Sequence, residues 1–481
     1  MKICFVASEA VPFVKTGGLA DVAGALPKAL ATSGCEVRLF LPLYKQIETE
    51  IHDLVENTAI GVVPVQIGAR LATFRVYESF LPESDVKTYL IHCPHYFHRD
   101  SIYTDQDDES ERFILFQHAV IQVLQRLQWQ PDIIHCNDWQ TGIIPALLQL
   151  NYNWDTLFQH TKTLFSIHNI GYQGRFGADA AIKAGFSPDD FYTGSGLEFE
   201  GSFSFLKTGI VYSDVITTVS PTYAAEIQTP EYGSGLHDVL ALRKNDLHGI
   251  LNGIDPNVWN PKTDQSIPFN YSVDRIANKL KNKHALLEHA KLPSQTGVAL
   301  IGIISRLAHQ KGVDLLQPIL KDLMRLPLQI VALGSGDPEL EAFYEKAAKD
   351  YPDHFFAHIG FDDKLAHLIT AGCDLFLMPS LYEPCGLNQM YSLKYGAAPI
   401  VRRTGGLRDT VTDYHEYYQE GNGFTFNDFD ARALFLTIKR ALDIYKKPKV
   451  WQKMMKRGMV EDFSWDASAD SYHKLYQIAG K

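Results

Sequence analysis

Lys2-Ile3-Cys4-Phe5-Val6-Ala7-Ser8 is a mostly apolar run of strand length, and Lys15-Thr16-Gly17-Gly18-Leu19-Ala20-Asp21-Val22 is a paired-glycine turn that leads into a helical pattern. Short β-branched runs that alternate with helical stretches are typical of a parallel sheet with crossover helices. The first run is too short for the apolar region of a signal peptide, and Glu9 ends it without a cleavage-like site. We therefore expect a soluble α/β protein that begins directly with its first strand.

The first half of the chain repeats this strand-and-helix pattern. Residues 60–80 alternate in a way that predicts an antiparallel hairpin added to the parallel sheet, and Glu111–Leu127 has the apolar spacing of a half-buried helix. The predicted strands are Lys2–Ser8, Glu36–Leu41, Lys87–Cys93, Asp132–Cys136, Thr163–His168 and Val215–Val219.

The second half has the same pattern and begins near residue 248. A polar stretch with two prolines, Asn257–Tyr271, follows Leu251-Asn252-Gly253-Ile254-Asp255 and indicates the junction. The segment Ser468–Ile478 is predicted to form a terminal helix. The predicted strands of this half are Val298–Ile304, Leu328–Leu333, Phe355–Ile359, Asp374–Met378 and Pro399–Val401.

Two domains are also what the length predicts, because a single core rarely serves 481 residues. We predict an α/β fold of two doubly wound domains, residues 1–248 and 249–461, facing each other across a deep cleft, followed by a terminal segment, residues 462–481. Sheets of this kind bind ligands beyond the carboxyl ends of their strands. The residues that follow strands are therefore the first candidates for a functional site.

The overall composition limits the kinds of partner. The net charge of −11 argues against a nucleic-acid or acidic-membrane surface, and the chain has no run of 18 apolar residues. Six cysteines without a C-x-x-C pair indicate reduced thiols in a cytoplasmic protein, and the histidines lack the spacing of metal ligands. We predict no metal site and no cofactor.

Two basic segments follow predicted strands. In the Lys15-Thr16-Gly17-Gly18 turn, glycine amides and a movable ammonium suit an anion, although a plain glycine turn with a solvated lysine is the alternative. In Ser305-Arg306-Leu307-Ala308-His309-Gln310-Lys311-Gly312, the Arg306 fork and the Lys311 charge suit a diphosphate, and a basic loop tip is the alternative. The turn is neither a dinucleotide fingerprint nor a P-loop.

Two further segments follow strands of the second half. Glu383-Pro384-Cys385-Gly386-Leu387 offers a carboxylate for sugar hydroxyls and helix-start amides for a phosphate; the alternative is an acid that only complements a helix dipole. Thr404-Gly405-Gly406-Leu407-Arg408-Asp409 is another glycine turn, which is either part of the site or a structural connection.

Two segments end strands of the first half. His135-Cys136-Asn137-Asp138-Trp139 offers an acid and an aromatic surface, both useful for binding carbohydrate. Ser166-Ile167-His168-Asn169 places a histidine at a strand end, where it is structural or catalytic. No Ser/His/Asp arrangement indicates a nucleophile.

Taken in order, these segments resemble the glycogen and starch synthases, retaining glucosyltransferases of the GT-B architecture, nearly from end to end. The resemblance implies two Rossmann-like domains, with ADP-glucose mainly on the second domain, the α-1,4-glucan acceptor mainly on the first, and a terminal helix that crosses back to the first. Its motifs are Lys2-Ile3-Cys4-Phe5-Val6-Ala7-Ser8-Glu9, the Lys15 turn, Asp138-Trp139, His168-Asn169, Asn252-Gly253-Ile254-Asp255, Arg306 with Lys311, Glu383-Pro384-Cys385-Gly386-Leu387 and Thr404-Gly405-Gly406-Leu407.

The resemblance also implies a role for each matching residue. Arg306 and Lys311 would hold the diphosphate, Lys15 and the Gly18 amide would close on it, Glu383 would bind glucose hydroxyls, and Phe361 would face adenine. Asp138, His168, Tyr96 and Asn252 would line the glucose site. The implied catalytic residues are His168, Asp138, Arg306, Lys311 and Glu383; the implied binding residues are Lys15, Gly17, Gly18, Tyr96, Asn169, Asn252, Phe361, Cys385, Gly386, Leu387, Tyr391, Thr404 and Gly405.

Three positions depart from the family pattern. Asn137 stands where a second histidine is common, and Asn388 replaces an expected threonine. Tyr391 lies eight residues after Glu383, where many related enzymes have a second glutamate, although tyrosine fits the glycogen synthase branch.

The resemblance predicts transfer of glucose from ADP-glucose to the non-reducing end of an α-1,4-glucan with retention of configuration. Same-face attack within an ion pair is favoured over a covalent intermediate, since the sequence offers no obvious nucleophile, and fixed cations make a metal unnecessary. Two alternatives stay open: an α-glucan phosphorylase, which would need lysine-bound pyridoxal phosphate, and a catalytically idle glucan-binding protein. The sequence alone does not distinguish ADP-glucose from UDP-glucose as the donor. It also does not define the preferred glucan length, allosteric regulation or the oligomeric state.

Overall fold

The computed structural model describes residues 1–415 and 417–480, and the chain divides into two compact units. Unit 1 comprises Met1–Gly253 and Trp465–Lys481, and unit 2 comprises Ile254–Ser464. The chain therefore passes between the units after Gly253 and again after Ser464, a few residues beyond the predicted bounds at 248 and 461. Lys481, the last residue of the predicted terminal segment, lies outside the described residues.

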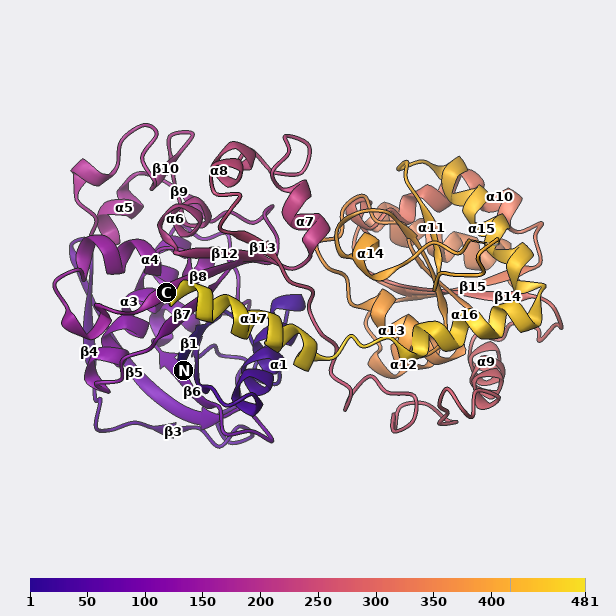
Figure 1. Cartoon of the computed structure of the whole chain (residues 1–481), viewed down its shortest axis with the longest axis horizontal. Helices are drawn as coiled ribbons and strands as arrows, with labels where there is room; N and C mark the ends of the chain where they lie inside the picture. Colours follow the sequence, from indigo (N-terminus) through magenta and orange to yellow (C-terminus); the bar gives the residue numbers. More distant parts are fainter. Residues whose placement is uncertain (416, 481) are drawn as a thin grey trace. The chain divides into compact units, whose positions relative to one another are not determined.

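Unit 1 is built on a ten-stranded sheet with the order β13-β12-β8-β7-β1-β2-β6-β5-β3, in which β4 pairs with β5 (Figure 1). The strands from β13 to β6 are parallel, whereas β5 runs antiparallel to β6, β4 and β3. The predicted hairpin, β4–β5, is thus confirmed. The bounds are β1 Lys2–Val6, β2 Glu36–Pro42, β3 Val55–Glu56, β4 Val63–Ile67, β5 Arg70–Phe80, β6 Lys87–His92, β7 Ile133–Asn137, β8 Lys162–Ile167, β12 Val215–Thr218 and β13 Leu247–Gly249.

Helices connect these strands, and a small second sheet, β10-β11-β9, follows β8. The helix predicted at Glu111–Leu127 is α3, and the helix after the glycine turn is α1. The bounds are α1 Gly18–Thr32, α2 Pro94–Phe97, α3 Glu109–Arg126, α4 Ile144–Ala146, α5 Asp179–Lys183, α6 Phe205–Tyr212, α7 Pro221–Glu226, α8 His237–Leu242, β9 Arg175–Phe176, β10 Glu198–Phe199 and β11 Ser202–Ser204.

The last helix, α17 (Trp465–Ala479), belongs to unit 1 and packs against α1. Its Tyr476 hydroxyl lies 2.7 Å from Nδ1 of His135 on β7. At the start of α17, a Cβ on Gly253 would lie 2.6 Å from the Trp465 nitrogen, so only glycine fits there. The place where the chain leaves unit 1 therefore packs on the place where it returns.

Unit 2 is built on a six-stranded parallel sheet with the order β16-β15-β14-β17-β18-β19. The strand bounds are β14 Ala299–Ile304, β15 Leu328–Gly334, β16 Phe355–Ile359, β17 Leu375–Met378, β18 Ala398–Arg402 and β19 Phe424–Phe426. The helix bounds are α9 Asn278–His289, α10 Leu320–Leu323, α11 Pro338–Asp350, α12 Asp363–Gly372, α13 Asn388–Lys394, α14 Gly405–Thr410, α15 Ala431–Tyr445 and α16 Pro448–Val460.

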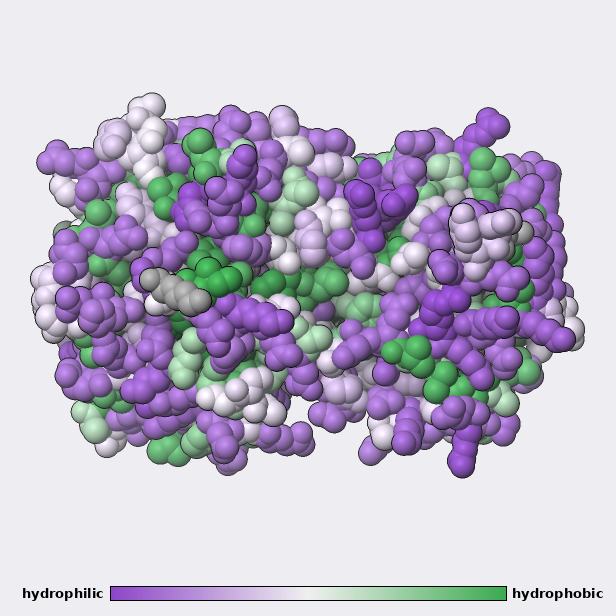
Figure 2. Space-filling view, in the orientation of Figure 1, coloured by the Kyte–Doolittle hydropathy of each residue, from purple (hydrophilic) through white to green (hydrophobic). Residues whose placement is uncertain are grey.

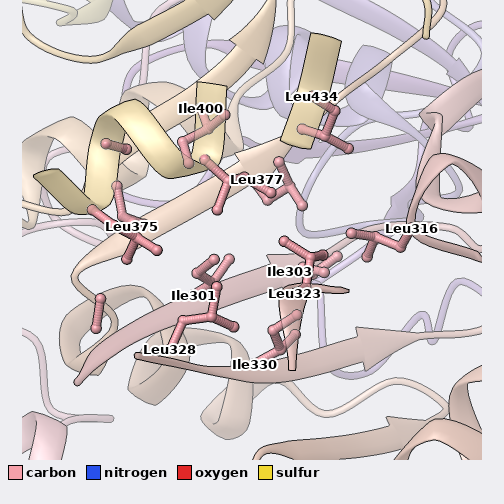
Figure 3. Packing of buried hydrophobic residues seen from close by; sticks show 14 of the residues in the cluster. Ile301, Ile303, Leu316, Leu323, Leu328, Ile330, Leu375, Leu377, Ile400 and Leu434 are labelled. Atoms are coloured by element: carbon pink, nitrogen blue, oxygen red, sulfur yellow. The ribbon is translucent and has the colours of Figure 1, made fainter. Parts of the chain in front are cut away.

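Both faces of this sheet are buried, which explains why its strands are continuous apolar runs. Alternate residues such as Ile301 and Ile303 pack on one face with Leu316 and Leu434 from helical segments (Figure 3). The residues between them, such as Leu300, pack on the other face.

Every predicted strand is present, with bounds within two residues of those expected. Six short strands of the described chain were not predicted: β3, β9, β10 and β11 in unit 1, β13 at the expected junction, and β19 near the end of unit 2. Each has only two or three residues, too few for a pattern of alternation.

Figure 2 shows one face of the molecule, on which hydrophobic residues are dispersed among a majority of hydrophilic ones. Among the described residues, no helix has the length and apolar character needed to span a membrane.

Candidate functional site

In unit 1, the first group of candidate residues lies where the order of the strands reverses. From β1 the chain builds the sheet through β2 and β6 on one side, and through β7, β8, β12 and β13 on the other. Open α/β sheets bind ligands beyond the carboxyl ends of the strands at such a point. Glu9 follows β1 and Asp138 follows β7, so both lie at this edge.

Glu9, which the sequence analysis did not assign a role, binds the glycine turn with its own carboxylate. Its Oε2 accepts hydrogen bonds from the Thr16 nitrogen at 2.5 Å, the Thr16 hydroxyl at 2.9 Å and the Gly17 nitrogen at 3.2 Å. The Gly17 N–H is therefore occupied within the turn, and the expectation that Gly17 contacts substrate stays a prediction. Gly18 begins α1, where amides have no partner within the helix, and among the described residues nothing lies within 4 Å of the position of its missing Cβ.

Lys15 is an exposed lysine whose single ion-pair partner among the described residues is the half-buried Asp21. Its Nζ donates to Oδ1 of Asp21 at 2.7 Å, and its side chain is 54% exposed. Burial raises the pKa of Asp21, and the Lys15 charge opposes that shift. Because exposed ion pairs contribute about 0–1 kcal/mol, the ammonium can exchange this carboxylate for another anion at little cost.

The buried Asp138 and the half-buried His168 are joined by a hydrogen bond at the ends of β7 and β8. Oδ1 of Asp138 accepts the His168 backbone N–H at 2.7 Å, and the carboxylate also accepts the Asn169 N–H. Burial nevertheless raises the pKa of Asp138 to about 7 and lowers the pKa of His168 to about 4. At neutral pH the imidazole is therefore uncharged, and the carboxyl group is partly protonated.

The remaining unit 1 candidates lie in different surroundings. Tyr96 is 0% exposed, and its hydroxyl donates to Glu111 on α3 at 2.8 Å. Tyr96 cannot line a sugar site, so that prediction is wrong: α2 turns the phenol into the core. Asn252 is buried with its Oδ1 unpaired within the described chain, and Asn169 accepts the Gly171 N–H.

In unit 2 the strand order reverses between β14 and β17, and the second group of residues lies there. Nζ of Lys311 donates to Oε2 of Glu383 at 2.7 Å, and the Ser380 hydroxyl donates to the same oxygen at 3.0 Å. The Lys311 side chain is 19% exposed and that of Glu383 7%. The structure thus brings together two residues that the sequence placed far apart in the chain.

Arg306 precedes Lys311 on the same loop and is exposed. Its Nη2 donates to Oε1 of Gln310 at 3.1 Å, and Nε2 of Gln310 donates to the Tyr382 carbonyl at 3.2 Å. The Leu381 N–H donates to the Gln310 carbonyl. Gln310 therefore fastens the loop that carries Arg306 to the loop that carries Glu383.

The Thr404-Gly405-Gly406 turn supports the Glu383 backbone. The Gly406 N–H donates to the Glu383 carbonyl at 3.1 Å, and a Cβ on Gly405 would lie 1.9 Å from that oxygen. Gly405 also has a φ of 43°, and Thr404 is 1% exposed. Gly405 is thus required for close packing of this turn. This is the role expected if the turn is a structural connection.

The residues after Glu383 lead into helix α13. Cys385 is buried, Gly386 has a φ of 72° and Leu387 caps α13, so the helix starts at Asn388 and later than predicted. Asn388 donates to the Ile304 carbonyl at 2.8 Å.

Two aromatic candidates of unit 2 lie in opposite surroundings. The Tyr391 ring stacks on Trp259 at 4.0 Å, and Trp259 stacks in turn on His367 at 3.9 Å. Phe361 is 89% exposed and free to present a ring face.

Sequence reasoning missed four polar or aromatic partners: Glu9, Gln310, Ser380 and Trp259. Glu9 directly follows the first strand and Gln310 lies within a quoted motif, so both could have been found by position. The contacts of Ser380 and Trp259 depend on the fold. Among residues 1–415 and 417–480, no group of three or more His, Cys, Asp or Glu residues could hold a metal ion.

The chain is similar to known proteins over nearly its whole length. Residues 2–242 match the family described as "Starch synthase catalytic domain", and residues 286–457 match "Glycosyl transferases group 1". Proteins named glycogen synthase from Moorella thermoacetica and Thermotoga maritima are 47% and 46% identical, covering 100% of this chain and 97% and 99% of theirs. The catalytic domain of starch synthase IV from Arabidopsis thaliana, solved with ADP and acarbose, matches with a TM-score of 0.90 and 34% identity over 99% of both chains. A sucrose-phosphate synthase from Thermosynechococcus elongatus shares the fold, with a TM-score of 0.60, 18% identity, and 99% and 98% coverage.

Proposed function

Since this chain belongs to the family of glycogen and starch synthases, we propose that it transfers glucose from ADP-glucose to the non-reducing end of an α-1,4-glucan, with retention of configuration. It is a glycosyltransferase with two Rossmann-like domains of the GT-B architecture. The observation that carries the proposal is the Lys311–Glu383 pair beside Arg306 at the strand reversal of unit 2. Cations suit a diphosphate, and a carboxylate suits sugar hydroxyls.

The choice of ADP-glucose as donor is supported by the relatives. The starch synthase IV structure holds ADP and acarbose, a nucleotide and a carbohydrate ligand. We therefore assign the diphosphate to Arg306 and Lys311, and the adenine to the exposed ring of Phe361. The glucan is the acceptor, bound mainly by unit 1.

The proposed glucosyl transfer depends on stabilising the charge of the leaving group and needs no protein nucleophile. Cleavage of the glucosyl–phosphate bond leaves negative charge on ADP, and the cations bound to the diphosphate, Arg306 and Lys311, stabilise it. The departing phosphate accepts the acceptor's hydroxyl proton as the new bond forms on the same face. No protein nucleophile and no metal ion is required in this scheme.

The buried groups of unit 1 act on the sugar. A histidine with a pKa of about 4 is neutral at neutral pH and cannot act as a general acid, which supports an orienting role for His168. Asp138, with a pKa of about 7, can accept or donate a hydrogen bond to a sugar hydroxyl. We also propose a cytoplasmic location, since all six cysteines are free thiols.

The test compares ADP-glucose and UDP-glucose side by side as donors to glycogen, with radiolabelled glucose, and determines the anomeric form of the new linkage by NMR. We expect incorporation from ADP-glucose, with α-linked product. Glucose 1-phosphate formed from glycogen and inorganic phosphate, with no incorporation from either nucleotide sugar, would instead identify a phosphorylase. Glycogen binding without incorporation or phosphorolysis would identify an idle binding protein.

A further inference from the structure

Asn137, the last residue of β7, is 0% exposed and holds its side-chain amide in one orientation. Its Nδ2 donates to the Val6 carbonyl at 3.0 Å and lies 3.4 Å from the His135 carbonyl. Exchanging the amide oxygen and nitrogen would turn the oxygen toward two carbonyl oxygens. The Asn137 oxygen must therefore face the other way, where Nε2 of His168 lies 2.9 Å from it.

This contact decides which ring nitrogen of His168 carries the proton. Asn137 Oδ1 can only accept, so the neutral imidazole must donate from Nε2–H and keep Nδ1 unprotonated. Within the described residues, Nδ1 makes no hydrogen bond.

The backbone at Asp138 explains how two consecutive residues reach the same histidine. Neighbouring side chains on a strand point to opposite faces of the sheet. Asp138 has a φ of 55°, which breaks the alternation just after Asn137, and its carboxylate accepts the His168 backbone N–H. A non-glycine residue held in this region is strained and persists only where its surroundings require it. Asn137 thus holds the ring while Asp138 holds the backbone.

We propose that Asn137 is a positioning residue that fixes His168 as the Nε2–H tautomer, so that Nδ1 remains an unprotonated acceptor. An amide does not titrate, so the tautomer of neutral His168 does not change with pH. The role of His168 in turnover rests on the proposed function, whereas its tautomer does not.

The other groups around the ring are compatible with this assignment. Asp138 contacts the His168 backbone, and Glu9 acts on Asp138 through its charge. His135 is occupied by Tyr476 at Nδ1 and by Ser166 at Nε2, and burial keeps its pKa well below the usual range. None of these groups is a permanent cation, and none bonds to the ring of His168.

The tautomer can be read directly by NMR. The full-length protein is labelled with 15N-histidine, and the His168 signals are identified by their loss in His168→Gln. We expect a protonated Nε2 and an unprotonated Nδ1, unchanged from pH 6 to 8. In Asn137→Leu, which is close in size but cannot accept, we expect signals of both tautomers. A protonated Nδ1 in the wild type, or an unchanged tautomer in Asn137→Leu, overturns the proposal.

Asn137→Asp provides the second variant, since its carboxylate keeps the acceptor in nearly the same shape. Its charge should raise the pKa of His168, so the acid limb of the kcat profile should move up by about one pH unit or more. In Asn137→Leu we expect kcat/KM to fall about 10-fold. An acid limb that stays in place in Asn137→Asp, together with an unchanged tautomer in Asn137→Leu, contradicts the proposal.

Gln117→Leu is the matched control. Gln117 is also a fully buried amide, and its oxygen accepts the Ile143 and Ile144 N–H groups away from His168. Its loss should lower stability and change neither the tautomer nor the pH profile. A chain with the expected tautomer but no transferase activity would refute the proposed function and leave the assignment of Asn137 standing.

Discussion

The edges at which the strand order reverses carry polar groups of opposite kinds in the two units. In unit 1, desolvation raises the pKa of Asp138 and lowers the pKa of His168. Both shifts favour the uncharged form of the side chain. In unit 2, Lys311 and Glu383 meet as a close ion pair beside the exposed Arg306.

The difference indicates which part of a nucleotide sugar suits each edge. Uncharged, rigid donors and acceptors fit sugar hydroxyls, which carry no charge. A cation whose carboxylate partner also has Ser380 as a hydrogen-bond donor can turn to a diphosphate without leaving that partner unsatisfied. We therefore propose that the cations of unit 2 bind the phosphates, whereas the uncharged groups of unit 1 bind sugar hydroxyls, as Glu383 of unit 2 also does.

The largest effect is expected from Lys311→Met, which keeps the length of the side chain and removes its charge. We expect kcat/KM for ADP-glucose to fall about 100- to 1,000-fold, because a fixed charge at the leaving group is lost. Lys283→Met is the control: Lys283 pairs with Asp374 at 2.6 Å at the other end of the strands, so its loss should lower stability and spare the kinetics of the folded enzyme. Equal kinetic losses in both variants would show that Lys311 serves only folding.

Lys15→Ala should have a smaller effect, because Lys15 is exposed and weakly held. Losing a charged hydrogen bond to the donor costs about 1.5–3 kcal/mol, or roughly 10- to 150-fold in kcat/KM. Lys45→Ala is matched to it, since Lys45 forms a similar exposed pair with Asp100 at 2.8 Å. Unchanged donor kinetics in Lys15→Ala would make Lys15 an ordinary surface lysine.

A third prediction concerns the free energy of unfolding between pH 5 and 6. The pKa of Asp138 is raised to about 7 in the folded state, so its contribution falls by about 1.4 kcal/mol per pH unit as pH rises. The pKa of His168 is lowered to about 4, so its contribution rises by about the same amount. The two contributions cancel in the wild type.

Single variants should reveal this cancellation in urea denaturation at pH 5 and pH 6. Asp138→Asn should gain stability relative to the wild type as pH rises, and His168→Asn should lose it. Parallel pH dependences in all three proteins would show that burial does not shift these groups.

The smallest effect is expected from chelation. If the cations of unit 2 suffice to stabilise the leaving diphosphate, exhaustive EDTA treatment should leave incorporation of glucose unchanged. Loss of activity that magnesium or manganese restores would assign part of that work to a metal ion.

The fold was predictable to the extent that strands have clear local patterns. Fully buried parallel strands such as β14 are apolar along their length, so their bounds follow from composition. A three-residue strand such as β13 has no such pattern, and its pairing with β12 is set by the sheet. The predicted junction at residue 248 therefore fell within β13 instead of after Gly253.

The site was predictable in position more than in contacts. Asp138, His168 and Arg306 follow strands, so topology alone places them at the ligand-binding edges. The orientation of Tyr96 depends on how α2 packs on α3, and the occupation of the Gly17 amide depends on a bond to Glu9 across seven intervening residues. Such contacts are tertiary and have no signal in the local sequence.

The division of work between the edges is tested most directly by calorimetric titration of ADP, without sugar or glucan, into the full-length wild type, Lys311→Met and Asp138→Asn. We predict that Lys311→Met weakens ADP binding about 10-fold or more, since it removes a charged contact to phosphate, whereas Asp138→Asn binds ADP like the wild type. ADP binding that survives the loss of Lys311 and is weakened by the loss of Asp138 would contradict this account.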